Sequence, residues 1–508
     1  MNVHSSKQSK RLFYPAILCV VGLLPAPCLH AEVTCPMVFS DHMVLQRDRP
    51  IAVWGDAKPG EAVTVEFNAR HQSAVADDAG HWHVSLDAAS ASTESRALTV
   101  RGTNTLTFSD VLVGDVWFCS GQSNMEKPLG PRKGQKPTDN YEEEIRRADH
   151  PLLRLYQVTQ RGKPQGKITG LRWLTCTPET IASTEFSAAA YFFGRELQHE
   201  LGVPIGLIHS SFGGTRIEAW MPSVAFASDP ALRGLENVPY DHWVKGVQAT
   251  ELYQSMVSPF TDFAICGFIW YQGETNCMNA EDLIYAHKQR ALIHSWRTAW
   301  GEPDAPFYYV LLAPFAYSHQ KNWAKQLTSE ALPALWEAHE QALDVPHTGM
   351  VVTTDLAGSG KDIHPTDKLD VGVRLARLAL ADTYGRKDVT AHSPRYHAMT
   401  HGRESREIKI SFTPAEALRS RDGKPLTDFV VTGKDHAFQT ATAIIEGDHV
   451  IVSSPLVANP VAVRFGWNEL ARPNLVNEAG LPVMPFRTDD WPLVLEVPKA
   501  PVADAATN

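Results

Sequence analysis

Short apolar runs alternate with segments of helical periodicity between residues 111 and 387, and this alternation constrains the fold more than any other feature. A chain that alternates strand and helix forms a parallel sheet whose two faces are covered by helices. We therefore predict a three-layer α/β domain over residues 111–387. Its expected strands are VLVGDVWFCS (111–120), LLRLYQV (152–158), VPIGLIHSS (203–211), FAICGFIWYQ (263–272), FYYVLLAP (307–314) and GMVVTTD (349–355), and its expected helices are 186–202, 281–300, one near 322–343 and one that ends at Tyr384.

Two β-rich regions flank this domain, in keeping with a chain of 508 residues that is too long for one hydrophobic core. Residues 32–110 and 388–499 carry short apolar runs between Gly, Pro, Asp and Asn turns. That spacing is typical of a β-sandwich or a jelly-roll-like region. We expect the tail at 500–508 to be disordered. The runs are IAVWG (51–55), AVTVEF (62–67), HWHVSL (81–86) and ALTVRG (97–102) before the domain, and REIKISF (406–412), FVVTG (429–433), HVIVSS (449–454) and VAVRFGW (461–467) after it.

Residues 1–31 have the three parts of a secretory signal peptide. A basic start is followed by a short apolar run from Leu12 to Leu24 and by a small-residue site near Ala31. An uncleaved membrane anchor is the alternative, although the run is short for a membrane span. A lipoprotein anchor on Cys28 fits less well, because Pro-Ala-Pro-Cys matches a lipobox poorly. We predict a secreted or periplasmic protein.

The charge of the chain excludes several classes of partner. Removal of residues 1–31 takes away three of the 47 basic residues and none of the 57 acidic residues, which leaves a net charge of −13. A chain so acidic is a poor partner for nucleic acid or for an anionic membrane. No later segment is long and apolar enough to span a membrane, so we expect no membrane insertion. The sequence does not indicate an oligomeric state.

Four polar loops follow expected strands of the α/β domain. Ligands of open α/β sheets bind outside the carboxyl ends of the strands, so these loops are expected to meet at one edge of the sheet. Each loop alone is a weak signal, because a Gly-Gly turn or a loop histidine is common. The loops are Gly121-Gln122-Ser123-Asn124, Gly213-Gly214-Thr215-Arg216, Gln272-Gly273-Glu274-Thr275-Asn276 and Asp362-Ile363-His364-Pro365.

Together the loops contain the parts that acyl transfer needs. Ser123 can be the nucleophile, and His364 can be the base that takes its proton. Asp362 can orient the imidazole and stabilise its cation. The Ser123 loop is not the G-x-S-x-G elbow of α/β-hydrolases, since Met125 stands where that motif has a glycine. This chemistry requires no cofactor.

An oxyanion also needs hydrogen-bond donors. Backbone N–H groups of Ser123 and of Gly213 or Gly214 can supply them, because a glycine lets the backbone approach closely. The side-chain amide of Gln272 is expected to be a third donor.

The motifs GDVWFCSGQSNM, GGTRIEAW, WYQGETN and DIHPTDK, in that order, resemble the sialate O-acetylesterase family, a branch of the SGNH esterases. FSDHMVLQRDRPIAVWG and RFGW…PFRTDDW extend the resemblance over most of the chain. It implies an SGNH-type catalytic domain and a serine esterase that removes acetyl groups from sugar hydroxyls. It also implies Ser123 as nucleophile, Gly213, Gly214 and Gln272 in the oxyanion hole, and His364 as base.

The resemblance has one departure at the acid. Many SGNH esterases place the acid three residues before the histidine, and that position here is Lys361. Asp362 is one residue closer. Either Asp362 adapts or a main-chain carbonyl of the same loop orients the ring.

The sequence leaves the acetylated sugar open. Similar proteins act on plant hemicellulose such as xyloglucan or xylan, whereas sialic acid carries a carboxylate that needs a cation. Arg216 could supply that cation, or it could form an ion pair with Glu218 or Asp115 instead. The candidates for sugar contacts, or for bracing the loops, are Asn124, Glu126, Arg216, Tyr271, Glu274 and Asn276.

Other functions have less support in the sequence. A non-catalytic glycan-binding protein would not need Ser123 and His364 together, and a lipid esterase would need an apolar acyl channel. His81 and His83 could share one face of a strand, but a third metal ligand is not apparent, so we predict no metal site. Cys266 and Cys277 could form a disulfide.

Overall fold

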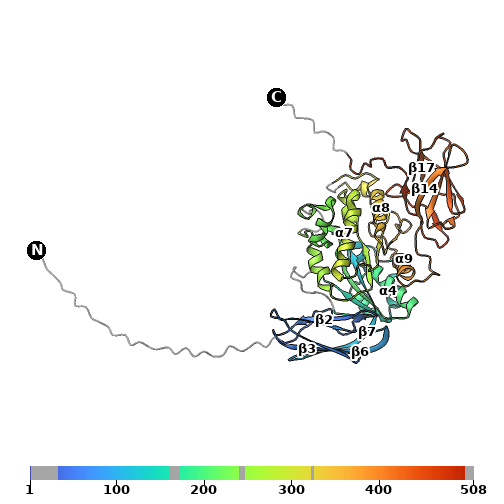
Figure 1. The fold of residues 1–508 in the computed structure, drawn as a ribbon. Helices are drawn as coiled ribbons and strands as arrows, with labels where there is room; N and C mark the ends of the chain where they lie inside the picture. Colours follow the sequence, from blue (N-terminus) through green and yellow to red (C-terminus); the bar gives the residue numbers. More distant parts are fainter. Residues whose placement is uncertain (2–31, 160–171, 239–245, 322–324, 498–508) are drawn as a thin grey trace.

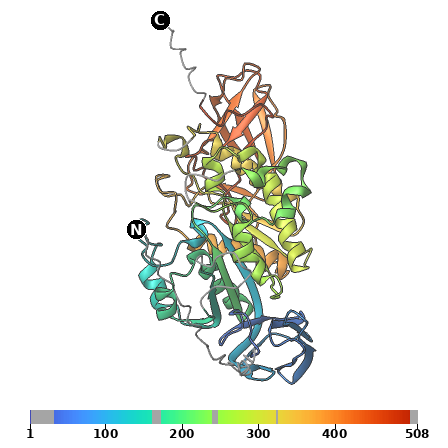
Figure 2. The same cartoon turned by 90° about the vertical axis from the view of Figure 1, so that its left-hand side faces the viewer.

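The computed structural model describes residue 1 and residues 32–159, 172–238, 246–321 and 325–497, so the expected signal peptide and the expected disordered tail lie outside the described residues. The α/β domain lies between the two β-rich regions (Figure 1; Figure 2). This confirms an α/β protein with a large, mostly parallel central sheet and additional antiparallel sheets.

The N-terminal region is built mainly from antiparallel strands, although β1 pairs parallel with β7. β3 pairs with β4 and β6, and β2 pairs with β5. In β5, exposed and buried residues alternate, as expected for a strand with one face in the core. The strands are β1 (Val44–Gln46), β2 (Ile51–Asp56), β3 (Ala62–Phe67), β4 (Arg70–Val75), β5 (His81–Leu86) and β6 (Ser92–Arg101).

One strand, β7 (Thr105–Gly121), connects this region to the α/β domain (Figure 2). Its first part pairs antiparallel with β6, and its last part lies between β10 and β11 of the central sheet. The burial pattern changes from alternating to continuous at Val111, where the strand becomes covered on both faces. The boundary that we predicted between residues 110 and 111 therefore falls inside a continuous strand.

The central sheet has the order β13-β12-β11-β7-β10-β8-β9, and only β9 is antiparallel to its neighbour. β7 lies in the middle of it, and the chain adds strands on either side. The remaining strands are β8 (His150–Gln157), β9 (Leu174–Cys176), β10 (Ile205–Ser211), β11 (Gly267–Tyr271), β12 (Phe307–Val310) and β13 (Thr348–Val351).

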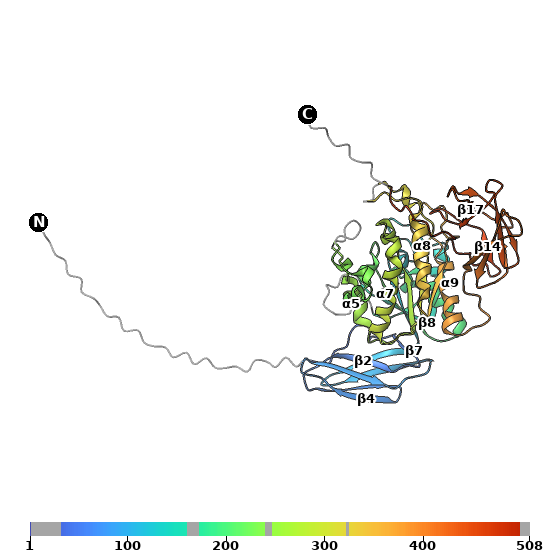
Figure 3. The same cartoon turned by 45° about the horizontal axis from the view of Figure 1, so that its top comes forward.

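Helices cover both faces of the sheet, as adjacent residues of β7 show. The Trp117 ring packs against Phe193 of α4, whereas the Phe118 ring packs against Trp296 of α7. Successive side chains of a strand point to opposite faces, so α4 and α7 lie on opposite sides. α9 packs beside α4 (Figure 1), and α8 packs beside α7 (Figure 3). The helices are α1 (Ser123–Glu126), α2 (Tyr141–Arg146), α3 (Pro178–Ser183), α4 (Ala188–Leu201), α5 (Ser223–Ser228), α6 (Glu274–Met278), α7 (Asp282–Trp300), α8 (Ala331–Gln341) and α9 (Leu369–Leu378).

The C-terminal region has its own hydrophobic core between two four-stranded antiparallel sheets. By contrast, the N-terminal region and the α/β domain share one continuous core. The strands are β14 (Arg395–His401), β15 (Glu407–Thr413), β16 (Leu418–Ser420), β17 (Phe429–Thr432), β18 (Gln439–Thr440), β19 (Thr442–Glu446), β20 (His449–Ser453), β21 (Ala462–Phe465), β22 (Leu475–Asn477) and β23 (Phe486–Arg487).

The suggested disulfide between Cys266 and Cys277 is wrong. Cys266 precedes β11 and Cys277 follows it, and both thiols are free. Five strand residues separate the two sites by about 16 Å, far beyond the Cα separation that a disulfide bridges.

A buried carboxylate joins the N-terminal region to the end of the α/β domain. Asp115 is 2% exposed and accepts two hydrogen bonds of 2.9 Å from Arg47 and one of 3.0 Å from the Tyr384 hydroxyl. The Asp115 side chain therefore links three segments of the chain, which contain Arg47, Asp115 itself and Tyr384.

We expect Asp115→Ala to lower the free energy of unfolding by about 3 kcal/mol, because Arg47 and Tyr384 lose their partner in a partly buried site. Urea unfolding of the purified protein measures this change. Asp56→Ala is the matched control, since the pair of Asp56 with His81 leaves both side chains 70% exposed and contributes little. Equal losses in the two variants would contradict the assignment.

Candidate active site

The four polar loops follow β7, β10, β11 and β13 and lie at the carboxyl edge of the central sheet. A cavity of about 460 Å³ opens between them. The structure thus brings Ser123, His364, Gly213, Gly214 and Glu126 together. The residues that line the cavity are Gln122, Ser123, Glu126, Gln135, Gly213, Gly214, Thr275, Met278, Phe315, Gln320, Ile363 and His364.

The position of Ser123 depends on a glycine at the end of β7. Gly121 has φ 144°, and a Cβ there would lie 2.1 Å from the carbonyl oxygen of Tyr271. Only glycine allows β7 and β11 to approach so closely. The backbone then turns through Gln122 into α1, which begins at Ser123.

The Gly213-Gly214 turn approaches Ser123 from β10. A Cβ on Gly213 would lie 3.2 Å from the Ser123 Cβ, and Gly214 adopts the left-handed conformation with φ 75°. The Gly213 N–H donates to Glu126 Oε2 at 2.8 Å, and Arg132 Nη2 donates to Glu126 Oε1 at 3.1 Å. Glu126 therefore lines the cavity and also braces the turn.

His364 is half-buried beside positive charge. Burial, together with Lys368, lowers the pKa of its imidazole to about 4, and the Asp362 carboxylate opposes this shift only in part. The imidazole is therefore neutral at neutral pH, as a general base must be.

Asp362 contacts the main chain of His364. Its Oδ1 accepts the His364 backbone N–H at 2.9 Å. Among the described residues, no carboxylate and no carbonyl is hydrogen-bonded to the His364 ring. In this structure Asp362 acts on the imidazole through its charge and through the shape of the turn.

Asn124 connects three of the loops from below the cavity. Its Nδ2 donates to the Ile363 carbonyl at 2.9 Å and to Glu274, and its Oδ1 accepts from Lys368 Nζ at 2.7 Å. Asn124 is 2% exposed. Burial raises the pKa of Glu274 and lowers that of Lys368, and each of these two groups is hydrogen-bonded to the Asn124 amide. These hydrogen bonds fix the position of the His364 loop relative to Ser123.

Gln272 does not line the cavity. It is fully buried, and its Nε2 donates to Gln122 Oε1 (3.0 Å), to the Thr215 carbonyl (3.1 Å) and to Asn276 Oδ1 (2.8 Å). Its Oε1 accepts from the Tyr285 hydroxyl at 2.6 Å. This differs from our expectation of a third oxyanion donor, because the amide hydrogens are already bound inside the protein.

Arg216 forms the ion pair with Glu218 that we considered, and it also pairs with Glu281. Lys288 lies against the same two carboxylates. The other suggested partner, Asp115, pairs with Arg47 instead.

Of the two roles considered for the six candidate residues, sugar contact or bracing of the loops, the structure favours bracing for most of them. Glu126 lines the cavity, whereas the other five candidates brace the loops from within. Four of these five are almost fully buried: Asn124, Tyr271, Glu274 and Asn276.

Sequence reasoning missed the loop that follows β12. Phe315 and Gln320 line the cavity from this loop. Its place after an expected parallel strand was the signal that could have identified it. The C-terminal region supports the same loop, since the buried carboxylate of Glu469 accepts from the backbone N–H of Ser318 at 2.9 Å and from its hydroxyl.

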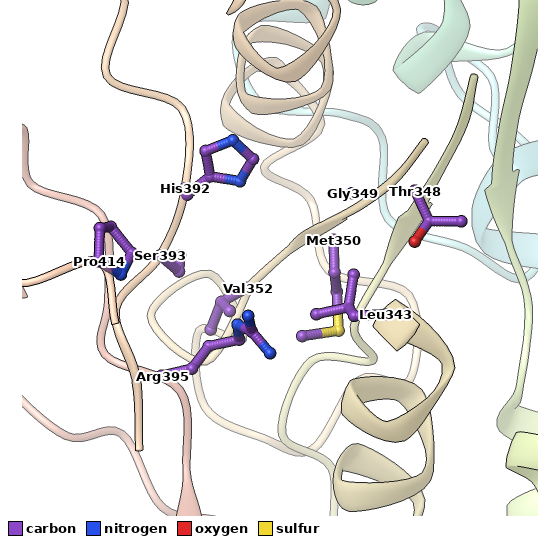
Figure 4. A pocket seen from close by; sticks show the side chains of 9 residues that line it. All are labelled: Leu343, Thr348, Gly349, Met350, Val352, His392, Ser393, Arg395 and Pro414. Carbon is purple, nitrogen blue, oxygen red and sulfur yellow. The ribbon is translucent and has the colours of Figure 1, made fainter. Parts of the chain in front are cut away.

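A second cavity of about 150 Å³ lies where the C-terminal region meets β13 (Figure 4). Met350 and Val352 line it from β13 and the residue after it, whereas His392 lines it from the connecting segment and Arg395 from the start of β14. His392 is hydrogen-bonded to Asp382 at 3.0 Å. This cavity contains none of the four polar loops.

Comparison with known proteins agrees with the site. The family model described as "Carbohydrate esterase, sialic acid-specific acetylesterase" matches residues 113–381, a range that holds all four loops. The chain belongs to this family. It is therefore a carboxylic-ester hydrolase of the carbohydrate esterases.

Relatives of this esterase cover most of its length. Sialate O-acetylesterase from Homo sapiens is 30% identical over 392 residues, which are 70% of this chain and 72% of that protein. Sialate O-acetylesterase from Mus musculus is 26% identical over 84% of this chain and 88% of its own. The crystal structure of a carbohydrate acetylesterase from Xanthomonas citri matches with a TM-score of 0.80 at 36% identity, covering 91% of this chain and 100% of that one.

Two further findings concern metal ligands and membrane-spanning helices. Within the described ranges, no set of three or more His, Cys, Asp or Glu side chains is placed to hold a metal ion. No helix in the same ranges is long and apolar enough to cross a membrane.

We expect Asn124→Ala to lower kcat/KM for an acetyl ester at least tenfold, because the Ile363 carbonyl loses its anchor and His364 moves relative to Ser123. The melting temperature should fall as well, since Lys368 and Glu274 lose a buried partner. Steady-state kinetics and thermal melting measure the two effects. Asn237→Ala, at an exposed position, is the control, and an Asn124→Ala enzyme as active as that control would contradict the role.

Proposed function

We propose that this esterase removes acetyl groups from sugar hydroxyls through an acyl-enzyme on Ser123, in a catalytic domain of the SGNH type. The observation that carries the proposal is the meeting of Ser123 and His364 at one cavity, on loops that Asn124 holds together. The Ser123 oxygen attacks the acetyl carbonyl while His364 Nε2 or Nδ1 takes the hydroxyl proton. The carbon–oxygen bond to the sugar then breaks, and the histidine returns the proton to the leaving alcohol.

Water completes the cycle. It attacks the acetyl-serine ester while the neutral imidazole takes one of its protons, and collapse of the intermediate releases acetate and restores the Ser123 hydroxyl. The Asp362 carboxylate stabilises the transient imidazolium, and we propose it as the acid of the site in preference to a main-chain carbonyl.

The amides of Ser123 and of the Gly213-Gly214 turn are proposed donors to the oxyanion. The Gly213 N–H is held by Glu126 in this structure, so it serves an oxyanion only when that carboxylate withdraws. The turn is close enough to Ser123 for this role, because a Cβ added to Gly213 would contact the Cβ of Ser123.

We propose a neutral acetylated oligosaccharide as substrate, such as a fragment of xyloglucan or xylan. A sialic acid would bring a carboxylate, and Arg216, the cation first considered for it, is engaged with Glu218 and Glu281. Using Arg216 as a clamp would leave buried carboxylates short of a partner, which is costly. The carbohydrate acetylesterase from Xanthomonas citri supports the broader substrate class. Acetate release from acetylated xyloglucan oligosaccharides and from O-acetylated sialic acid, measured side by side, tests this preference.

We also propose that residues 1–31 direct export and that the enzyme acts outside the cytoplasm. The basic start and short apolar run of that segment support this proposal.

We expect Ser123→Ala to lower kcat for acetate release by about 10⁴- to 10⁶-fold, because the acyl-enzyme cannot form. The fold should be unchanged, since a hydroxyl at the edge of a cavity is lost without creating a void. Acetate release from both substrates and circular dichroism measure the result. Ser183→Ala, at an exposed helix end, is the control; a Ser123→Ala enzyme with the activity of that control would end the proposal.

We expect the acid limb of the kcat/KM profile near pH 4, well below the ordinary histidine range. The base works only when neutral, so activity falls as the pH drops through the pKa of His364, and a lowered pKa moves that fall to lower pH. Arg132 also lowers this pKa, so Arg132→Gln should move the limb upward. Initial rates between pH 3 and pH 8, each checked for enzyme stability, measure both; a limb near 6.5 that Arg132→Gln leaves in place would contradict the prediction.

A further inference from the structure

We infer that the side-chain amide of Gln122, rather than that of Gln272, donates the third hydrogen bond to the oxyanion. The inference rests on the proposed function and names a further catalytic residue for it. Gln122 stands between the last residue of β7 and Ser123. Gln122 is one of the residues that line the cavity, although only 2% of it is exposed.

The orientation of the Gln122 amide follows from its neighbours. One end faces the backbone N–H groups of Gly273 at 3.4 Å and Thr275 at 3.3 Å, and Gln272 Nε2 at 3.0 Å. Backbone N–H groups can only donate, so the end that they face must be the oxygen. The NH₂ group is then at the opposite end of the planar amide.

That NH₂ group is the part of Gln122 left for a ligand. Within the described residues, Gln122 Nε2 donates to no hydrogen-bond acceptor. It is also absent from the set of fully buried side-chain atoms that have no partner. Amide donors in protein interiors are normally satisfied, so a donor left open at a cavity beside a nucleophile is available to what binds there. Ser123 and the Gly213-Gly214 turn line the same cavity.

Gln272 holds this donor in place. Its two amide hydrogens are shared among Gln122, Thr215 and Asn276, and its oxygen accepts from Tyr285. A hydrogen-bonded chain therefore runs from Tyr285 through Gln272 to Gln122. A donor fixed before the reaction begins stabilises the developing oxyanion without reorganisation, which is the condition for a large effect.

The Gly213 N–H already donates to Glu126, so the oxyanion depends more strongly on a hydrogen bond from Gln122. While Glu126 holds the Gly213 N–H, the oxyanion receives hydrogen bonds from the Ser123 amide and the Gln122 side chain. The bonds to the oxyanion are stronger than those to the neutral carbonyl of the ester, so the loss of Gln122 is expected in kcat rather than in KM.

The test compares Gln122→Met, Gln122→Glu and Gln272→Met in hydrolysis of p-nitrophenyl acetate, with a melting temperature for each. Gln122→Met keeps the volume and removes both polar ends. Gln122→Glu keeps the acceptor for Gly273 and Thr275 and removes the donor. We expect both to lower kcat about 100- to 1,000-fold with KM changed less than about threefold. Gln272→Met should lose less, since the donor itself remains.

Two outcomes overturn the inference. One is a Gln122→Glu enzyme within about threefold of the wild-type kcat, which decides the question even if Gln122→Met does not fold. The other is a greater loss in Gln272→Met than in either Gln122 variant at similar melting temperatures, which would return the donor role to Gln272. Ser123→Ala in the same assay separates the two proposals: if it stays active, the acyl-enzyme is wrong whatever Gln122 does, and if it is inactive, the Gln122 variants test the donor alone.

Discussion

The site depends on one buried side-chain amide. Asn124 belongs to the loop of Ser123, and its hydrogen bonds reach Ile363, Glu274 and Lys368 on two other loops. A parallel sheet places loops near one another at its carboxyl edge but does not set their relative positions to the fraction of an ångström that proton transfer needs. A buried amide with several partners does so, because any shift of one loop leaves a polar group unsatisfied.

The two flanking regions are attached in different ways. The N-terminal region shares β7 and a continuous core with the α/β domain, so the two are one structural unit. The C-terminal region has a separate core and is held by polar contacts: Arg464 pairs with Glu330 and Arg487 with Glu337. Glu469 extends from it to Ser318, which places a residue of the last region against the loop that follows β12.

The local charge of the site opposes that of the chain. The protein is acidic overall, yet burial and the positive charges of Lys368, Lys127 and Arg132 lower the pKa of His364. Buried carboxylates of Glu218 and Glu274 are matched to Lys288, Arg216 and Asn124 below the cavity. The carboxylates behind the cavity are therefore paired within the protein, and the polar residues that line the cavity include Ser123, His364 and Gln122.

The sequence by itself determined most of the elements and the edge of the sheet at which Ser123 and His364 meet, because strand-length apolar runs and the polar loops after them are local patterns. The helices at 186–202 and 281–300 appear within two residues of their expected ends. Only the tertiary structure decided which way each polar side chain points. Gln122 and Gln272 carry the same amide at two strand ends, yet one lines the cavity and the other is fully buried. Their roles differ because hydrogen-bond partners come from distant segments, such as Tyr285 and Asn276 for Gln272, and such partners leave no pattern in the sequence.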